Sequence, residues 1–491
     1  MVIICKILHG RDDELLELYR GLVYNLPMRS KRIAIVFFCM VLLPFLGSAC
    51  STMMNSEQLE GPVSAVPSQT ATLTPAAIPP SQTSEPSSQM PTPSSAVTRL
   101  PQSWIFPDAE IINSLTSVGF DIESYLGSTS GCLADYEQFT ISNGWIGGAD
   151  LVEMVAIENS INPKLLLALI EYQSGYVFGN PEDPELALPA LGNREYYRQD
   201  LYGQLDWAVN RLSEGFYGWL NGTVREIEFQ DGQIIVPSEE INAGSFALMF
   251  FFAGFHSGAE WENDLDPELG LPALYLDMFG NPWNNPAAVV PLVPSNLSQP
   301  ALSLPFEVGV TWALTGGPHP AFEGNGPLAA LDFVPPMAKA GCYQTGEWVT
   351  AVADGLVVRS ELGQVVQDLD GDGFEGTGWA ILYLHIGDKD RVPVGTYLKQ
   401  GEFLGHPSCE GGKAFGTHLH LARKYNGVWM AADGDVPFVL DGWQAITGEA
   451  PYQGGLVKGE ETVTADQFGA LCSLLYRDCE LSSPIISKIS R

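Results

Sequence analysis

The central part of the chain carries the hydrophobic pattern of amphipathic helices. Apolar residues recur there at intervals of three and four, the spacing that places them on one face of a helix. Pro163 stands where the first turn of a helix favours proline. We therefore expect an α-helical domain over residues 104–290. Four runs predict its main helices: 150–156, 162–170, 203–219 and 242–255.

From about residue 305 the pattern changes to the two-residue alternation of β-strands. Asp354-Gly355 and Asn426-Gly427 are dipeptides typical of tight hairpins. These signals predict a mostly β C-terminal domain of antiparallel sheets over residues 305–460. Its expected strands are 348–353, 356–360, 379–386, 416–421 and 428–430.

The N-terminal part has the order of a secretory signal. Basic residues 28–32 precede an apolar run at 33–46, and small residues lead to Cys50. The run is shorter than the ~20 residues of a membrane span, and Met28 is the expected start. Residues 47–50 resemble a bacterial lipoprotein box, which implies a lipid anchor on Cys50. Simple secretion with cleavage nearby is the alternative.

The segments between these regions are poor in large apolar residues. Residues 51–103 are rich in Ser, Thr and Pro and predict a disordered linker. The expected organisation is thus an upstream segment with the signal, this linker, the helical domain, a second linker, the β domain and a tail. The corresponding ranges are 1–50, 51–103, 104–290, 291–304, 305–460 and 461–491.

Charge and cysteine content narrow the classes of function. The formal net charge is −34, from 58 acidic and 24 basic residues, so the basic footprint of a nucleic-acid-binding protein is absent. The chain holds eight cysteines without a Cys-x-x-Cys pair. In an oxidising compartment Cys342 with Cys409 and Cys472 with Cys479 are plausible disulfides. Cys132 is then expected as a buried free thiol.

Several fragments of the helical domain resemble the lysozyme-like fold of lytic transglycosylases. They are Asn162-Pro163, residues 171–175, Gln204-Leu205 and residues 242–244. The resemblance implies that fold, degenerate here, and glycan binding. Gln173 occupies the position of the family's catalytic Glu, with Glu171 two residues earlier, and an amide cannot donate the proton that glycosidic cleavage needs. A packing domain without a ligand is the alternative.

Five of the seven histidines lie within about a hundred residues of the β domain: His319, His385, His406, His418 and His420. On a strand, His418 and His420 project to one face while Leu419 and Leu421 project to the other. Two imidazoles side by side are half of a zinc site.

Three more polar groups can complete that site. Asp332 stands among apolar residues, and a carboxylate buried there needs a partner such as a metal. Alternation places His385 on the same face as Tyr383 of its strand. His319 lies in a loop upstream, and His406, expected in a surface turn, competes with it.

This combination of motifs resembles the lysostaphin/LytM-type zinc endopeptidases of the M23 family, with their duplicated hybrid motif. The likeness covers residues 315–432. It implies that His319, Asp332 and His420 bind zinc, and that the catalytic His385 and His418 stand beside the attacking water and the oxyanion. Residues 320–331 separate the first two ligands by more than the family's usual few residues, which predicts a looped insertion.

A second metal motif lies before the strand of His385. Asp368, Asp370 and Asp372 alternate and are followed by Gly373, as in the first half of an EF-hand calcium loop. The acidic residue at the loop's twelfth position is missing, and Glu375 is an irregular substitute. A solvated acidic hairpin is the alternative to calcium binding.

The resemblance implies a zinc metalloendopeptidase that hydrolyses peptide bonds in the cross-links or stem peptides of bacterial peptidoglycan. Its location would be extracytoplasmic, in the cell envelope, anchored to the membrane at Cys50 or secreted. The alternative function is a catalytically inactive envelope protein that binds peptidoglycan or regulates another cell-wall hydrolase.

Overall fold

The computed structural model describes residues 104–478, except for residues 142, 181–188, 323, 325 and 337–340. The expected signal segment at 1–50 and the linker at 51–103 lie outside the described residues. In the part that is described, no helix combines the length and the hydrophobicity needed to cross a membrane.

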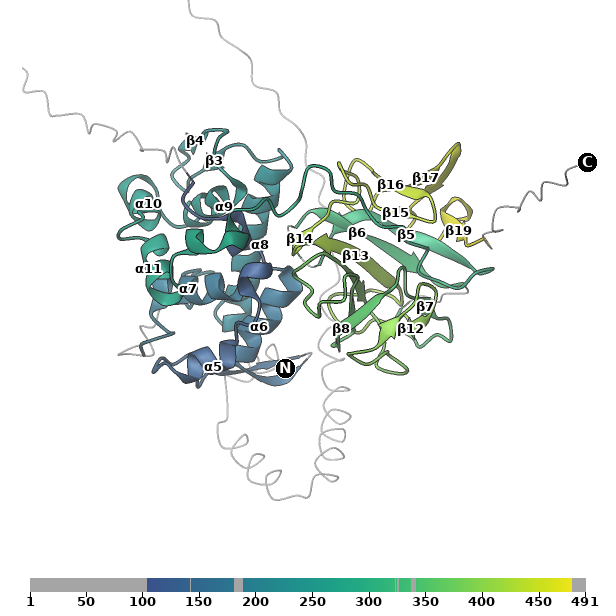
Figure 1. Ribbon diagram of the computed structural model, residues 1–491, viewed down its shortest axis with the longest axis horizontal. Helices are drawn as coiled ribbons and strands as arrows, with labels where there is room; N and C mark the ends of the chain where they lie inside the picture. The colour runs from purple at the N-terminus through teal and green to yellow at the C-terminus, as the bar shows by residue number, and fades with distance from the viewer. Residues whose placement is uncertain are drawn as a thin grey trace, which may run out of the picture. The chain divides into compact units, whose positions relative to one another are not determined.

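The first part of the described chain is helical, as predicted (Figure 1). It includes two short hairpins, β1–β2 (Glu137–Thr140 and Gly144–Gly147) and β3–β4 (Ile227–Glu228 and Ile234–Ile235). Its helices are α4 (Asp108–Ile111), α5 (Ile122–Gly127), α6 (Gly148–Asn159), α7 (Pro163–Ser174), α8 (Leu201–Leu220), α9 (Ala243–Phe252), α10 (Gly258–Asp264) and α11 (Leu271–Phe279).

Local chemistry explains where the helix α7 begins and ends. The Asn162 side chain accepts a hydrogen bond from the backbone N–H of Lys164 at 3.0 Å, and Pro163 occupies the first turn. The helix ends at Gly175, whose φ of +71° is costly for other residues. All four predicted helices are present, as α6, α7, α8 and α9.

The second part is built from β-strands, which confirms the predicted fold class. The strands β18 and β19 lie in the segment expected as a tail and pair with β17 and β5. The strands are β5 (Thr311–Pro320), β6 (Leu328–Val334), β7 (Val349–Thr350), β8 (Gly355–Glu361), β9 (Gln364–Asp368), β10 (Trp379–Leu384), β11 (Tyr397–Leu398), β12 (Phe403–Gly405), β13 (Leu419–Tyr425), β14 (Val428–Trp429), β15 (Val439–Leu440), β16 (Trp443–Thr447), β17 (Gly454–Lys458), β18 (Glu461–Thr464) and β19 (Leu474–Tyr476).

The main sheet has the strand order β11-β8-β9-β10-β13-β6-β5-β19, with β14 attached to β13. All of its pairs are antiparallel, as expected for this domain. The strand β13 carries His420, with His418 just before its first residue, and it lies between β10 and β6 near the middle of the sheet. A separate four-stranded sheet has the order β15-β16-β17-β18.

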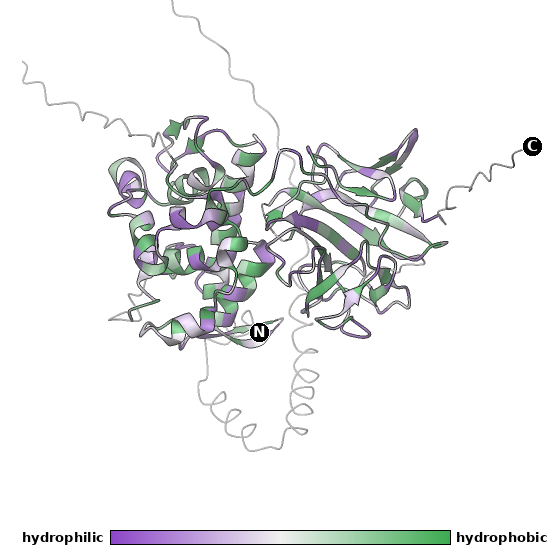
Figure 2. Cartoon of the chain, in the orientation of Figure 1, coloured by the Kyte–Doolittle hydropathy of each residue, from purple (hydrophilic) through white to green (hydrophobic). Residues whose placement is uncertain are grey.

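The two faces of the main sheet bury different cores. On β10, Ile381 and Tyr383 belong to one hydrophobic cluster, while Leu382 and Leu384 belong to the cluster that also contains the helices. Figure 2 shows the resulting mixture of hydrophobic and hydrophilic residues along the strands. Since Leu384 lies opposite His420 on β13, His420 projects to the same face as Leu384.

One predicted hairpin is confirmed and one is wrong. Asn426 and Gly427 both have positive φ, +48° and +80°, and join β13 to β14. Asp354-Gly355 is not a hairpin, because β7 pairs with β12 whereas β8 pairs with β9 and β11. Between them, the carbonyl of Ala353 accepts a hydrogen bond from Gln367, which ties the segment to another strand.

The cysteine predictions have mixed outcomes. Cys342 and Cys409 form the expected disulfide, a bond typical of an oxidising compartment. Cys132 is a free thiol, but it is half-buried rather than buried. Cys479 lies outside the described residues, so its pairing with Cys472 stays a prediction.

Candidate metal centre

The centre forms where three neighbouring strands of the main sheet, β13, β6 and β5, bring their polar side chains to one face. In the antiparallel register, His420 lies opposite Asp332, and Asp332 lies opposite Gly316. The twelve residues between His319 and Asp332 are accommodated by the β5–β6 hairpin, whose register is irregular around His319. The insertion therefore extends the hairpin without separating these two side chains.

Three side-chain atoms converge at this point. His319 Nε2 lies 3.0 Å from His420 Nδ1 and 3.2 Å from Asp332 Oδ1, and His420 Nδ1 lies 3.3 Å from Asp332 Oδ1. All three residues are buried. In a tetrahedral site with bonds near 2.0–2.1 Å, ligand atoms stand about 3.3 Å apart. The observed triangle therefore has the size of one face of a zinc tetrahedron.

Backbone carbonyls decide which imidazole nitrogens are left free. His319 Nδ1 lies 2.8 Å from the carbonyl of Gly317, and His420 Nε2 lies 2.9 Å from that of Ala321. A carbonyl only accepts hydrogen bonds, so these nitrogens carry the N–H. When both rings are neutral, His319 Nε2 and His420 Nδ1 present lone pairs to each other and to Asp332. Such second hydrogen bonds orient metal-binding histidines.

Asp332 supplies a further sign that a cation fits here. Its Oδ1 is buried and makes no hydrogen bond among the described residues, which is costly for a carboxylate oxygen. A Cβ on Gly316 would stand 2.6 Å from Asp332 Oδ2, so only glycine leaves the carboxylate its place. Three lone-pair atoms facing one another require a positive charge between them, and two imidazoles with one carboxylate suit zinc.

The electrostatics of the three groups show that the Asp332 carboxylate attracts positive charge to this point. Burial lowers the pKa of His420. For His319, burial also lowers the pKa, but the Asp332 carboxylate outweighs it and raises the pKa above its ordinary value. For Asp332, burial raises the pKa, and the His319 imidazole outweighs it and holds the pKa well below its usual range. The carboxylate is thus kept ionised.

The structure also brings His385 and His418 together beside this triangle. Their ring centroids are 4.4 Å apart, and His418 Nε2 lies 3.8 Å from Asp332 Oδ1. Their Nδ1 atoms lie 3.0 Å and 2.7 Å from the carbonyls of Glu410 and Gly416, respectively. Each therefore keeps an Nε2 without a proton when neutral. Burial, with some help from His418 and His420, lowers the pKa of His385 to about 3.

The alternation argument for His385 is wrong, although the residue lies where it was expected. Tyr383 points to the other face, where its hydroxyl accepts a hydrogen bond from Val352 N–H and donates one to Gln367. The strand β10 ends at Leu384, and His385 has a φ of +68°. This left-handed residue breaks the period of two and turns the imidazole toward His418.

The other candidate for the triangle, His406, lies elsewhere. Its ring packs against Trp348 with centroids 3.9 Å apart, and its Nδ1 lies 2.8 Å from the carbonyl of Glu347. Tyr452, which the sequence did not single out, stacks on His319 with centroids 4.2 Å apart. Nothing in the sequence around Tyr452 indicates this contact, because it depends on the four-stranded sheet meeting β5.

The acidic loop places oxygens of Asp368, Asp370 and Asp372 within 4.8 Å of one another. Calcium binding stays a prediction, since both oxygens of Asp368 already accept backbone N–H groups of the loop. The suggestion that Glu375 substitutes as a ligand is wrong. Its carboxylate is held by Arg359 at 2.9 Å and by Lys424 at 2.7 Å.

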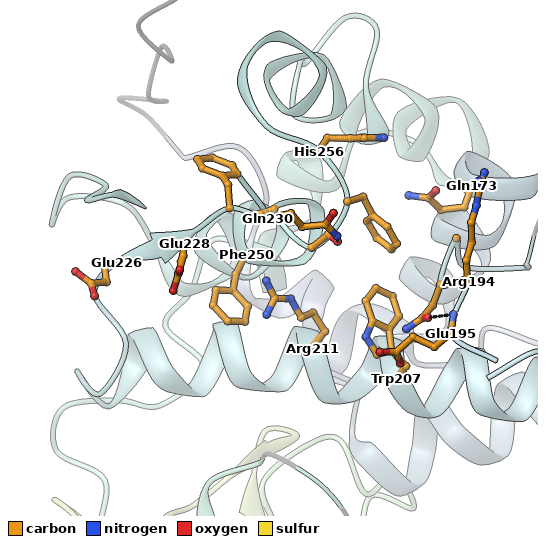
Figure 3. Close-up of a pocket in the computed structure, with 16 residues that line it drawn as sticks. Gln173, Arg194, Glu195, Trp207, Arg211, Glu226, Glu228, Gln230, Phe250 and His256 are labelled. Carbon is orange, nitrogen blue, oxygen red and sulfur yellow. Dashed lines mark hydrogen bonds between the residues drawn. The ribbon is translucent and has the colours of Figure 1, made fainter. Parts of the chain in front are cut away.

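In the helical region, Gln173 and Glu171 have different surroundings. Glu171 Oε2 accepts hydrogen bonds from the backbone N–H groups of Val177 and Phe178 at 3.0 Å and 3.1 Å. Gln173 lines a cavity (Figure 3). The carboxylate thus closes a turn, while the amide lies in the cavity wall, with its nitrogen buried and without a hydrogen bond among the described residues.

Comparisons with known proteins found matches to both the helical region and the β region. The family model "LasA, N-terminal domain" matches residues 104–293. Protease LasA of Pseudomonas aeruginosa is 26% identical over 335 residues, which cover 64% of this chain and 72% of the relative. The beta-lytic metalloendopeptidase of Lysobacter enzymogenes is 25% identical over 134 residues, or 27% of this chain and 74% of the relative.

Solved structures that match part of the chain include the M23 metalloprotease pseudoalterin. It is 20% identical, with a TM-score of 0.29, and the match covers 34% of this chain and 96% of that one. The catalytic domain of lysostaphin from Staphylococcus simulans is 23% identical, with a TM-score of 0.19, covering 25% and 89%. In its relatives and in its buried His-Asp-His cluster, the chain resembles the LasA/M23 family of lysostaphin-like zinc metalloendopeptidases.

Proposed function

We propose that the chain hydrolyses peptide bonds of bacterial peptidoglycan, with zinc held by His319, Asp332 and His420. The observation that carries the proposal is the triangle of three lone-pair atoms, 3.0–3.3 Å apart, around a buried carboxylate oxygen with no hydrogen bond. Three protein ligands leave a fourth position open, as in catalytic zinc sites.

Zinc held by His319, Asp332 and His420 would be a Lewis acid that could polarise a peptide carbonyl and lower the pKa of a water molecule. The chain's own part is to orient the ligands. Because the carbonyls of Gly317 and Ala321 hold the other imidazole nitrogens, the two rings cannot rotate away from the metal position. The stacking of Tyr452 on His319 further restricts rotation of the His319 ring.

His385 and His418 are proposed to move the proton. The low pKa of His385, caused first by burial, keeps its Nε2 unprotonated, so that this nitrogen is available as a hydrogen-bond acceptor beside the site. His418, at 3.8 Å from Asp332 Oδ1, stands on the adjacent side of the site. Once protonated, either Nε2–H can donate to the developing oxyanion or to the leaving amine.

Peptidoglycan as the substrate rests on the resemblance of the sequence to lysostaphin-type enzymes. A location outside the cytoplasm is supported by the Cys342–Cys409 disulfide. The secretory signal and the lipid anchor at Cys50 remain part of this proposal, since they lie outside the described residues.

The test uses the full chain with purified peptidoglycan sacculi. We expect one zinc per chain by elemental analysis and the release of new amino groups, without new reducing sugars, as sacculi are digested. Treatment with a chelator should stop the release, and added zinc should restore it. A zinc-loaded chain that binds sacculi but releases no amino groups would instead support the inactive envelope protein.

A further inference from the structure

The Cys342–Cys409 disulfide lies beside the backbone groups that orient His385 and His418. It joins residues 67 positions apart in the sequence, with Cα atoms 5.7 Å apart. Cys342 is exposed and Cys409 is half-buried, so the bond lies at the edge of the β region rather than within its hydrophobic core. What the disulfide holds in place is therefore found in the two segments that it joins.

On one side of the disulfide, residues 408–410 contact both histidines. The Nδ1 of His385 lies 3.0 Å from the carbonyl of Glu410. The N–H of Ser408 donates a hydrogen bond to the carbonyl of His385 at 2.6 Å, and the carbonyl of Ser408 accepts one from the N–H of His418 at 3.2 Å. The position of this segment therefore affects the imidazole of His385 and the backbone of His418 together.

On the other side, the segment from Gly341 to Tyr343 binds the residues just before β13. Thr417 donates its N–H to the carbonyl of Gly341 at 3.2 Å. The Thr417 hydroxyl accepts a hydrogen bond from the N–H of Tyr343 at 2.9 Å and donates one to the carbonyl of Tyr343 at 2.7 Å. Thr417 stands between His418 and Gly416, whose carbonyl lies 2.7 Å from His418 Nδ1. The segment therefore holds the turn of backbone that orients the His418 ring.

The segment from Gly341 to Tyr343 has few other polar anchors. Among the residues that the structure describes, Thr417 is its hydrogen-bond partner, and no second one lies outside the segment. Because Gly341 and Cys342 are exposed, water can replace these hydrogen bonds at little net cost. A covalent bond does not exchange with water, so the disulfide is what keeps this segment against residues 408–410.

The three proposed zinc ligands have separate supports. The carbonyls that orient the two imidazole ligands belong to Gly317, within β5, and Ala321, just after it. Asp332 lies on β6, which pairs with β5 and β13. None of these supports belongs to the two segments joined by the disulfide, so the metal ligands and the two further histidines are held independently.

We propose that the Cys342–Cys409 disulfide is a positioning element of the peptidase, which holds His385 and His418 in the orientation that catalysis needs. It keeps each Nδ1–H on its backbone carbonyl and each Nε2 toward the site, because the hydrogen bond at one ring nitrogen fixes the tautomer and the direction of the other. The inference rests on the proposed function for the reaction that these histidines serve. Zinc binding does not require the disulfide.

The first test combines Cys342→Ser with Cys409→Ser in the full chain and supplies zinc. We expect one zinc per chain, as in the wild type. With soluble cross-linked muropeptides as substrate, kcat and kcat/KM should both fall roughly 10- to 100-fold at unchanged KM, since a small misplacement of catalytic groups costs up to about 100-fold. The matched control is Cys132→Ser, which removes a free thiol and should leave zinc content and kcat unchanged.

A second readout does not depend on peptide hydrolysis. Nitrogen NMR of isotopically labelled histidines, in alkaline buffer where the rings are neutral, reports which ring nitrogen carries the proton. The signals are assigned with His385→Ala and His418→Ala. We expect one tautomer, protonated at Nδ1, for both rings in the wild type and a mixture in the double Ser variant. If the wild-type chain cleaves no muropeptide, the proposed function fails, and these signals still decide the positioning.

Thermal melts show whether each variant folds. If the double Ser variant does not fold, Thr417→Val decides alone, because it removes the hydroxyl that binds Tyr343 at nearly the same shape. We expect the same fall in kcat with zinc retained. Either an unchanged kcat or unchanged tautomers in a folded variant would overturn the proposal. So would a loss of zinc in proportion to the loss of activity, which would show that the disulfide supports the metal ligands instead.

Discussion

Two clusters in the β region have metal-binding motifs in the sequence, and their surroundings differ. Around Asp332, backbone carbonyls engage the imidazole N–H groups and leave lone pairs facing one another. Around Asp368, backbone N–H groups engage the carboxylate oxygens themselves. The first cluster therefore lacks a positive charge that its lone pairs can bind. In the second cluster, backbone N–H groups of the loop already bind the oxygens of Asp368.

The comparison shows that ligand spacing alone does not identify a metal site. What matters is whether the surrounding backbone donates hydrogen bonds to the candidate ligands or accepts hydrogen bonds from them. Glu375 illustrates the same point, since it is close in sequence to the acidic loop but is held by two buried cations. Four substitutions test this distinction.

The largest effect is expected from His420→Ala. Removing a proposed ligand should abolish zinc binding, and peptide hydrolysis should fall by more than the ~10,000-fold limit of acid–base help. Zinc content and sacculus digestion measure both quantities. The matched control is His406→Ala, which removes a histidine packed on Trp348 and should leave both unchanged per folded chain. Retention of zinc by His420→Ala would contradict the ligand assignment.

A smaller effect is expected from His418→Ala. This histidine has a free Nε2 but is proposed to act on the water and the oxyanion, so the variant should keep its zinc. Hydrolysis should fall by ~100- to 10,000-fold, the range of general acid–base catalysis. The same two measurements apply. Loss of zinc together with activity would instead make His418 a ligand.

Glu375→Gln should reduce the free energy of unfolding at pH 7 by about 3–5 kcal/mol, because Arg359 and Lys424 lose their buried partner. Burial raises the pKa of Glu375, but those cations outweigh it and lower the pKa to about 2, against an ordinary 4.5. The stabilisation is therefore present above pH 4.5 and is lost as the pH falls toward 2.

Urea unfolding of both proteins across that pH window measures the difference, which should shrink toward acid. Glu361→Gln, an exposed carboxylate on β8, is the control and should cost little. A constant difference from pH 7 to pH 2 would show that the charge of Glu375 is not the cause. Unchanged stability at pH 7 would contradict the buried ion pairs.

The smallest effect is expected from Gly316→Ala. The new Cβ would stand 2.6 Å from Asp332 Oδ2, so the carboxylate must shift. Zinc affinity should then fall ~10- to 100-fold, the loss that is typical when a group that orients a metal ligand is removed. Zinc titration against a competing chelator measures the affinity. Gly326→Ala in the same hairpin has no atom within 4 Å of its Cβ, so an equal effect there would contradict the mechanism.

Much of the fold and part of the site followed from local patterns. Helix α7 was predictable because Asn162 and Pro163 are start signals that act within a few residues. The same holds for the Asn426-Gly427 hairpin, whose residues tolerate positive φ. The false hairpin at Asp354-Gly355 has an equally good local signal, but strand partners are chosen by contacts distant in sequence.

The sequence by itself determined that His418 and His420 share one face, because the period of a strand is two. Tertiary structure alone decided that His385 joins them, through its left-handed backbone, and that the carbonyls of Gly317 and Ala321 fix the free nitrogens. It also decided that Gln173 lies in the wall of a cavity. Periodicity acts between neighbours, whereas these positions depend on how separate strands and helices pack.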